Sequence, residues 1–326
     1  MYYLLITILL LFCLLAYFSI AKKYKIIDKP NERSSHSRIT IRGGGIIYPV
    51  SLICFLVILL FDNNTINPQI HYWVFGLGLL IISIISFIDD VMMLSPLVRI
   101  IFHFLSVTLL LFSIDGFSLP IWIIALYYIF VIGIINSYNF MDGINGITGL
   151  YSLVALGSLY FVNENISVFK ADFIIFPIIA SLVFLFFNFR KKAKCFAGDI
   201  GSFSISFWII TLIAGFIIYT GNYKYLLFLT VYGVDSVLTI IERLKLKENI
   251  FDAHRRHLYQ LFVNEKKQSH LLVSFMYVIL QALVNIFLIK TDFSFAMYFL
   301  IIVIPLVFIY IAIKIYIKNS IRNIKL

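Results

Sequence analysis

The chain has 326 residues, of which 62% are hydrophobic and only 13% are charged. Soluble domains carry about 25% charged residues, so this balance excludes an ordinary soluble domain and indicates a protein solvated by a lipid bilayer. A net charge of +10 would suggest nucleic acid as partner of a soluble protein; in a membrane protein it indicates basic loops on one face and anionic lipid or phosphate partners, with no nucleic acid.

Apolar runs of membrane-spanning length predict an all-α, polytopic membrane protein with 10 to 11 helices in a single domain, residues 1–326. The runs lie at 2–21, 46–61, 73–88, 98–113, 119–136, 147–162, 173–189, 203–219, 223–241, 271–289 and 295–317. The run 223–241 is the weakest, because the turn before it is short. The three cysteines, Cys13, Cys54 and Cys195, are scattered and predict neither a disulfide framework nor a metal site.

The distribution of lysine and arginine predicts the orientation of the spans. The first run has no basic residue before it and is followed by Lys22, Lys23 and Lys25, which indicates an uncleaved span with the N-terminus outside. Of the 26 basic residues, 23 fall in loops on the side of these lysines. This asymmetry places that side, which also holds the C-terminus and every polar motif, in the cytoplasm of a cell with its plasma (inner) membrane as the location.

The stretch 136–149 lies between two apolar runs and combines polar side chains with glycines. Asn136, Asn139 and Asp142 are spaced i, i+3 and i+6, which brings them together at a helix end. Oxygen ligands beside a flexible turn suit a hard cation such as Mg²⁺ and the phosphates that it carries. A capped turn between helices is the alternative, since Asn, Asp and Gly favour turns.

Two further acidic motifs adjoin spans on the same side. Asp89 and Asp90 end the third run, and neighbouring carboxylates at a membrane boundary suit acid/base or metal chemistry, with a solvated helix end as the alternative. Arg99 follows, either to reach a phosphate or to anchor its helix at the headgroups. Asp199, between two glycines, is placed to cap a helix or to bind a metal.

Two basic loops offer phosphate-binding groups. His254, Arg255, Arg256 and His257 provide several donors for a diphosphate, with contact to anionic headgroups as the alternative. Zinc is rejected because arginine is a poor neighbour for it. In the first loop, Arg42 and the N–H groups of 43–45 are placed to hold a phosphate, although the spacing matches no known phosphate loop.

Two isolated polar residues within predicted spans receive simpler interpretations. His103 is expected to hydrogen-bond between helices, and Asp235 is expected to pair with Arg243.

In this order, the loops resemble the polyprenyl-phosphate N-acetylhexosamine-1-phosphate transferases, glycosyltransferase family 4. The likeness runs from Asp28 to about Phe262 and rests on five motifs: Arg-Gly-Gly-Gly at 42–45, Asp-Asp at 89–90, Asn-x-x-Asp-Gly at 139–143, Gly-Asp at 198–199 and the His loop. The family includes undecaprenyl-phosphate GlcNAc-1-phosphate transferase and the phospho-N-acetylmuramoyl-pentapeptide transferase of peptidoglycan synthesis. Its fold is a helix bundle with an active-site cleft on the cytoplasmic face.

The resemblance implies that an (N-acetyl)hexosamine-1-phosphate is transferred to undecaprenyl phosphate with release of UMP. The donor would be a UDP-sugar, specifically a UDP-amino-sugar. It assigns Mg²⁺, or alternatively Mn²⁺, to Asn139 and Asp199, with Asp142 beside them as a catalytic residue. It gives Asp89 and Asp90 the catalytic role of either orienting the acceptor phosphate or taking its proton. The His–Arg loop would hold the donor diphosphate, and Arg42, Arg99 and Asn136 would assist in substrate binding.

One departure bears on the substrate. The run His-Arg-Arg-His-Leu-Tyr-Gln at 254–260 stands where many relatives have a His-rich run. This form resembles the subset that initiates O-antigen or capsule synthesis, so Tyr259 and Gln260 are expected to tune the choice of donor. The peptidoglycan enzyme, a cation-coupled transporter and an inactive scaffold remain alternatives, and a homodimer remains open.

Overall fold

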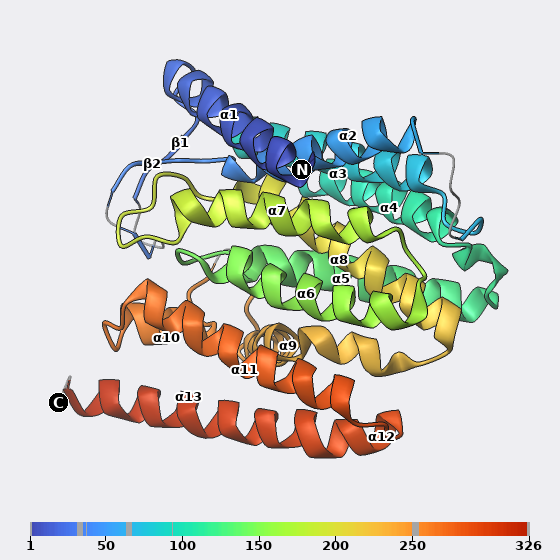
Figure 1. Ribbon diagram of the computed structural model, residues 1–326. Coiled ribbons are helices and arrows are strands. Elements are labelled where there is room, and N and C mark those ends of the chain that lie inside the picture. Colours follow the sequence, from blue (N-terminus) through green and yellow to red (C-terminus); the bar gives the residue numbers. More distant parts are fainter. Residues whose placement is uncertain are drawn as a thin grey trace.

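The computed structural model describes residues 2–30, 35–36, 38–62, 67–92, 94–249 and 254–324, with the side chains to 320. The described chain is almost entirely helical, which confirms the all-α prediction (Figure 1). The longer helices are α1 (Tyr2–Lys23), α2 (Ile47–Leu59), α3 (Tyr72–Met92), α4 (Pro96–Ser113), α5 (Ile121–Met141), α6 (Ile147–Ile166), α7 (Ala171–Asn188), α8 (Gly198–Thr220), α9 (Thr230–Lys245), α11 (His270–Lys290) and α13 (Ile304–Ile324).

Short elements join these helices. They are η1 (Gly44–Ile46), η2 (Gly116–Ser118), η3 (Tyr223–Leu229), α10 (Leu258–Asn264), α12 (Phe295–Tyr298), the π-helical turn η4 (Phe299–Val303) and the two-residue strands β1 (Ile27–Asp28) and β2 (Thr40–Ile41).

All eleven predicted runs are helical, and nine helices of the described residues are long and apolar enough to cross a membrane. The run at 46–61 forms the shorter apolar helix Gly44–Leu59, and the run at 147–162 forms α6, which is not among the nine. Their length and composition make the chain a multi-pass membrane protein.

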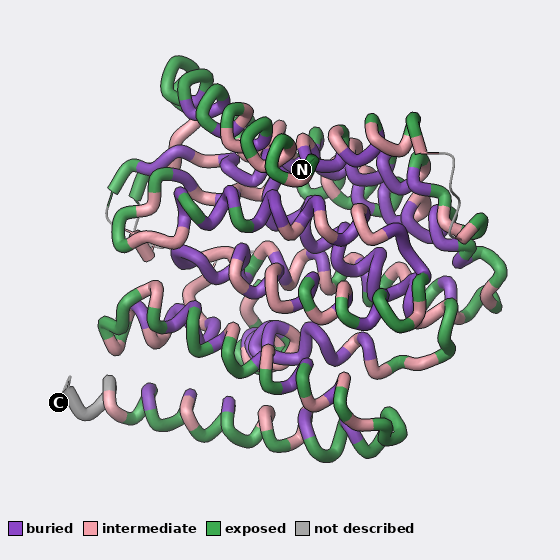
Figure 2. Tube along the Cα trace, viewed as in Figure 1, coloured by how far each residue is buried: buried purple, intermediate pink, exposed green. Residues whose placement is uncertain are grey.

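Helix α8 lies at the centre of the bundle. It is apolar around its whole circumference, and 94% of its most apolar window is buried, as expected for a helix enclosed by other helices. Helices α3, α5 and α6 pack against it. By contrast, α1 and α13 lie at opposite outer edges of the bundle, and much of their surface is exposed (Figures 1 and 2). Their exposed side chains are mainly apolar, so they suit contact with lipid.

The first loop is fixed to the start of α8 by backbone contacts. Strands β1 and β2 pair antiparallel, and Ile41 then forms a parallel bridge with Cys195. The N–H groups of Gly44 and Gly45 donate to the carbonyls of Phe196 and Ala197, at 2.8 and 2.9 Å. The expected use of these two N–H groups for phosphate is therefore wrong, because the adjoining segment already accepts their hydrogen bonds.

The polar motifs gather at one end of the bundle, together with the C-terminus (Figure 1). At the other end, Lys170 forms an ion pair with Asp62 at 2.6 Å and Lys224 lies 3.6 Å from Asp292. Lys170 and Lys224 thus have carboxylate partners, whereas the polar end carries the excess of positive charge.

Candidate functional site

A polar cavity of about 330 Å³ brings together predicted site residues from three separate segments. Arg42 comes from the first loop, Asn139 and Asp142 from the end of α5, and Asp199 from the first turn of α8. Four of the predicted site residues therefore share one cavity, although up to 157 positions separate them along the chain.

Asp90 lies behind this cavity, where it binds the N-terminus of α8. Its carboxylate accepts hydrogen bonds from the backbone N–H groups of Asp199 and Ile200, at 3.0 and 3.2 Å. These groups lack partners within the helix, and the positive end of the helix dipole favours a carboxylate there. Arg42 completes the arrangement: its Nε lies 2.7 Å from Asp90 and its second guanidinium nitrogen lies 3.1 Å from Asp199. The side chain of Asp90 is fully buried, so it positions both neighbours.

The neighbouring carboxylate points elsewhere. Asp89 accepts the N–H of Leu94 at 2.6 Å and forms an ion pair with Arg99 at 2.9 Å. This contact closes the turn between α3 and α4. The predicted pair of adjacent carboxylates is thus divided between two surroundings, and only Asp90 contacts the groups of the polar cavity.

The end of α5 supplies oxygen atoms that suit a hard cation. Asn139 Oδ1 accepts a hydrogen bond from Ser202 at 2.9 Å, and Asp142 Oδ1 accepts one from Thr148 at 2.7 Å. Burial raises the pKa of Asp142 to about 6, the hydrogen bond from Thr148 opposes this rise, and the charge of Asp199 adds to it.

A magnesium ion fits the donor set of this cavity. Asn139, Asp142 and Asp199 all present oxygen to it, and a nearby cation would relieve the raised pKa of Asp142. No group of three His, Cys, Asp or Glu side chains that could hold a metal occurs among the described residues. A cation here would therefore depend on the amide oxygen, on water and on substrate phosphates, as is usual for Mg²⁺.

A second, apolar cavity of about 450 Å³ adjoins the first. Its polar lining consists of Arg99, Asn136, Asn139, Gln260, His103, His254 and His257, and its apolar lining of Pro96, Ile100, Ile132, Phe140, Phe203 and Ile240. Asn139 and Gln260 line both cavities. The three residues predicted to act together at the end of α5 are therefore divided between the two cavities. Asp142 lines the polar cavity, Asn136 lines the apolar cavity, and Asn139 lines both. His103 lies there with its ring 4.6 Å from that of Phe203.

The four basic residues of the His–Arg loop have three different environments. His254 and His257 line the apolar cavity, whereas Arg255 lines a basic cavity described below. Arg256 forms ion pairs with Glu248 and, at 3.6 Å, with Glu242. Burial lowers the pKa of His254 to about 4, and the charges of neighbouring basic groups lower it further, so His254 is neutral at pH 7.

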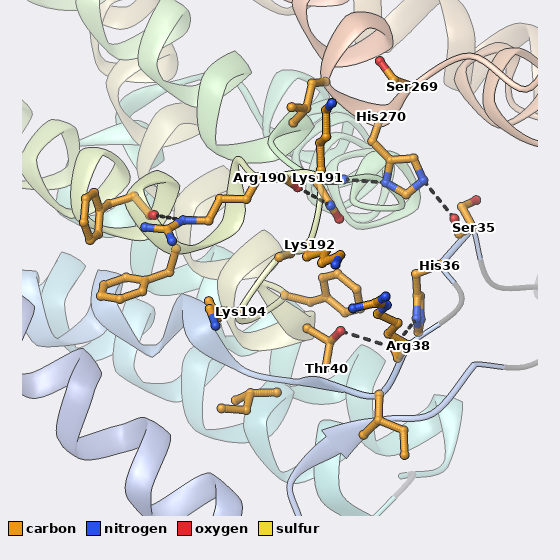
Figure 3. Close-up of a pocket in the computed structure, with 18 of the residues that line it drawn as sticks. Ser35, His36, Arg38, Thr40, Arg190, Lys191, Lys192, Lys194, Ser269 and His270 are labelled. Atoms are coloured by element: carbon orange, nitrogen blue, oxygen red, sulfur yellow. Dashed lines mark hydrogen bonds between the residues drawn. The ribbon is translucent and has the colours of Figure 1, made fainter.

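The basic cavity, of about 1340 Å³, opens beside the polar one (Figure 3). Its basic residues are Lys22, His36, Arg38, Arg190, Lys191, Lys192, Lys194, Arg255, Lys267 and His270. His270 connects the two sides of this region: one ring nitrogen lies 2.8 Å from the carbonyl of Ser35 and the other lies 3.3 Å from the N–H of Asn145. The accumulation of positive charge suits a polyanionic ligand.

Several residues of the site were not predicted. Ser202 and Thr148 hold Asn139 and Asp142, while Asn188 accepts the N–H of Gly146 at 2.6 Å. Thr148 lies within the polar stretch 136–149 and Ser202 three residues after Asp199, so proximity in sequence was the available signal. Nothing in the sequence connects Asn188 to Gly146.

Tyr259 is expected from the sequence to tune the choice of donor, but it lines neither the polar nor the apolar cavity. It is fully buried, and its hydroxyl donates to the carbonyl of Phe140 at 2.9 Å. A Cβ atom on Gly143 would lie 2.2 Å from the same hydroxyl. Tyr259 therefore holds the turn after α5, whereas Gln260 lines both cavities.

The fold and the cavities define a multi-pass membrane protein with a polar site at one end of a helix bundle. Comparison with known proteins agrees with the predicted resemblance: residues 72–218 match glycosyl transferase family 4.

Two similar proteins extend the match over most of the chain. Undecaprenyl-phosphate alpha-N-acetylglucosaminyl 1-phosphate transferase of Thermotoga maritima is 26% identical over 263 residues, covering 78% of this chain and 80% of the relative. A probable undecaprenyl-phosphate N-acetylglucosaminyl 1-phosphate transferase of Bacillus subtilis is 24% identical over 260 residues, covering 74% of this chain and 70% of the relative.

Proposed function

We propose that the chain transfers an amino-sugar 1-phosphate from a UDP-sugar to undecaprenyl phosphate and releases UMP. The names of both similar proteins support the type of transfer and the acceptor. The excess of basic residues at the polar end supports a cytoplasmic site in the plasma membrane.

The contact between the two cavities is the observation that carries this proposal. The polar cavity offers oxygen ligands and adjoins a basic surface, which suits a nucleoside diphosphate with its cation. The apolar cavity offers a hydrocarbon surface with Arg99 and two histidines, which suits a phosphate on a polyprenyl chain. Asn139 and Gln260 line both, so the two substrates would meet there.

The roles of the residues follow from their surroundings. We assign the cation to Asn139, Asp142 and Asp199, where it would neutralise charge on the donor diphosphate. Arg255 and the basic cavity would bind the donor. Arg42 and Asp90 would keep Asp199 in place through the ion pairs and hydrogen bonds described above.

The transfer itself requires correct placement more than acid or base chemistry. An oxygen of the acceptor phosphate attacks the phosphorus attached to the sugar; a new P–O bond forms as the bond to UMP breaks. A phosphate monoester with its second pKa near 6 is largely ionised at pH 7, so the attacking oxygen needs no added base. Asp89 would act on the acceptor by fixing Arg99 at 2.9 Å, beside the apolar cavity.

The proposal also includes the glycan pathway that this transfer would begin. The sequence at 254–260 favours the initiation of O-antigen, capsule or a related glycan. A cation-coupled transporter is disfavoured, because the carboxylates gather at one end of the bundle, whereas transporters bind their ions near the middle of the membrane.

The test uses the purified full chain in lipid with undecaprenyl phosphate, Mg²⁺ and a panel of UDP-sugars. We expect UMP release with at least one UDP-amino-sugar, and loss of that release in EDTA. Asp199→Asn should abolish release, whereas Asp292→Asn, at an exposed side chain of the opposite end, should not. Substrate movement across the membrane without UMP would contradict the proposal.

A further inference from the structure

A buried carboxylate outside the predicted site holds one histidine of the His–Arg loop. Asp235, in α9, is 1% exposed. Its Oδ1 lies 3.1 Å from Nδ1 of His257 and accepts the N–H of Leu258 at 3.2 Å. Tyr277 donates to Oδ2 at 2.6 Å and Tyr310 donates to Oδ1 at 3.2 Å. The expected pairing of Asp235 with Arg243 is replaced by these contacts, and Arg243 lies 3.3 Å from Glu248.

This arrangement selects the reactive atom of His257. A carboxylate oxygen accepts hydrogen bonds, so Nδ1 carries a proton directed at Asp235. The other nitrogen, Nε2, has no hydrogen-bond partner in the described part of the chain. Water does not reach it freely either, because His257 is only 1% exposed. An unpaired buried polar atom costs free energy unless a ligand satisfies it.

The apolar cavity is where such a ligand would lie. His257 lines it together with Arg99, and no acidic side chain is among the residues that line it. The cavity therefore suits an anionic group on an apolar chain. The donor's polar and basic surroundings lie on the other side of Asn139 and Gln260.

We propose that Asp235 is a positioning residue that orients His257, so that Nε2 binds the phosphate of the lipid acceptor. This inference rests on the proposed function and refines it, because His257 then serves the acceptor and Arg255 the donor. Nε2 would then hydrogen-bond to the phosphate, while Asp235 fixes the ring through Nδ1.

The experiment measures transfer by the full chain in lipid with each substrate varied in turn. Asp235→Asn and His257→Ala should each raise the acceptor KM by about 10- to 100-fold, the scale expected for a lost charged hydrogen bond. The donor KM should change by less than about twofold. The double variant should lose no more than His257→Ala alone, because both substitutions remove one interaction.

A second set of variants separates positioning from folding. Tyr277→Phe removes the 2.6 Å hydrogen bond to Asp235 and leaves His257 intact, so the acceptor KM should rise less than in Asp235→Asn. Lys314→Met changes a buried residue of the same region, which bonds to Tyr310 at 2.9 Å and not to Asp235, and should leave the acceptor KM unchanged. Thermal melting in detergent checks that each variant is folded.

Direct binding distinguishes this inference from the proposed function. Undecaprenyl phosphate is titrated into the protein without donor, and the wild type should bind it more tightly than Asp235→Asn. A wild type that transfers sugar phosphate while Asp235→Asn keeps its acceptor affinity would overturn the role of Asp235. Equal changes in both KM values would also overturn it by indicating general damage. A wild type that neither binds nor transfers would contradict the proposed function itself.

Discussion

At the scale of single residues, identical side chains differ in role because their surroundings differ. Asp89 and Asp90 are adjacent in sequence, yet one pairs with Arg99 and the other binds Arg42 and the start of α8. The sequence predicted a pair at a membrane boundary, but not this division. Consecutive residues on a helix point in directions about 100° apart, and only the folded neighbours decide what each side chain meets.

The two arginines of the His–Arg loop form a matched pair for testing donor binding. Arg255 lines the basic cavity, whereas Arg256 already forms ion pairs with Glu248 and Glu242. We expect Arg255→Ala to raise the KM for the UDP-sugar by about 10- to 100-fold, as for a lost charged hydrogen bond. Arg256→Ala should instead lower the melting temperature, with a smaller change in donor KM. A larger donor effect in Arg256→Ala would reverse this assignment.

The raised pKa of Asp142 predicts how pH affects the cation. With a pKa of about 6 against an ordinary 3.8, the folded protein holds this proton more tightly than the unfolded chain does. The carboxylate therefore costs stability once it ionises: without metal, its contribution becomes less favourable as pH rises from about 4 through 6. Mg²⁺ requires the ionised form and loses affinity as pH falls below about 6.

Thermal melting with and without Mg²⁺ tests this prediction. We expect a larger stabilisation by Mg²⁺ at about pH 7.5 than at about pH 5, and a weaker dependence on pH in Asp142→Asn. Asp292→Asn, which changes an exposed carboxyl at the opposite end, is the control. Equal stabilisation at both pH values would remove Asp142 from the cation site.

At the scale of elements, the helices were predictable and the short connections were not. Long apolar runs identified every membrane helix, because lipid requires the backbone to satisfy its own hydrogen bonds. The hairpin of β1 and β2 and the short helix α10 were not predicted. Two-residue strands have no detectable periodicity, and α10 takes its place from contacts such as that of Tyr259 with Phe140.

The close approach of the first loop to α8 gives a prediction for glycine. A Cβ atom on Gly45 would lie 2.0 Å from the Cα of Gly201, so the two backbones must separate in Gly45→Ala. Overpacking of this kind costs about 1–3 kcal/mol, and the shift should also disturb Arg42 and lower transfer. Melting temperature and UMP release measure both effects.

Gly157→Ala is the matched control for this substitution. Gly157 lies within α6 with nothing within 4 Å of an added Cβ, so alanine should leave stability unchanged or raise it slightly through its helix propensity. Similar losses in the two variants would show that the packing of Gly45 is not the cause.

At the scale of the whole molecule, the sequence predicted which loops share a face without showing how they meet. Counting basic residues placed the five motifs on one side, and the structure brings four of their residues to one cavity. The pairing of Asp235 with His257 could not be predicted from the sequence. It joins a span to a loop 22 positions away and depends on the packing of α9 against α11 and α13. A buried polar residue can be recognised in a sequence, but its partner cannot.

The orientation in the membrane is the remaining prediction at this scale, and exposed residues at the two ends can test it. Lys192 lies at the polar end and Asp292 at the other, and both are exposed. Each is changed to cysteine in a chain whose Cys13 and Cys54 are replaced by serine. Cys195 is kept, since it is fully buried.

The excess of positive charge predicts that the polar end faces the cytoplasm. In intact spheroplasts, a membrane-impermeant maleimide should therefore label the Asp292→Cys variant, and should label Lys192→Cys only after the membrane is opened. The chain without either substitution controls for background labelling. A donor nucleotide is made and kept in the cytoplasm, so this orientation is also a requirement of the proposed transfer. Labelling of Lys192→Cys from outside would place the polar cavity on the wrong side for a UDP-sugar and contradict both predictions together.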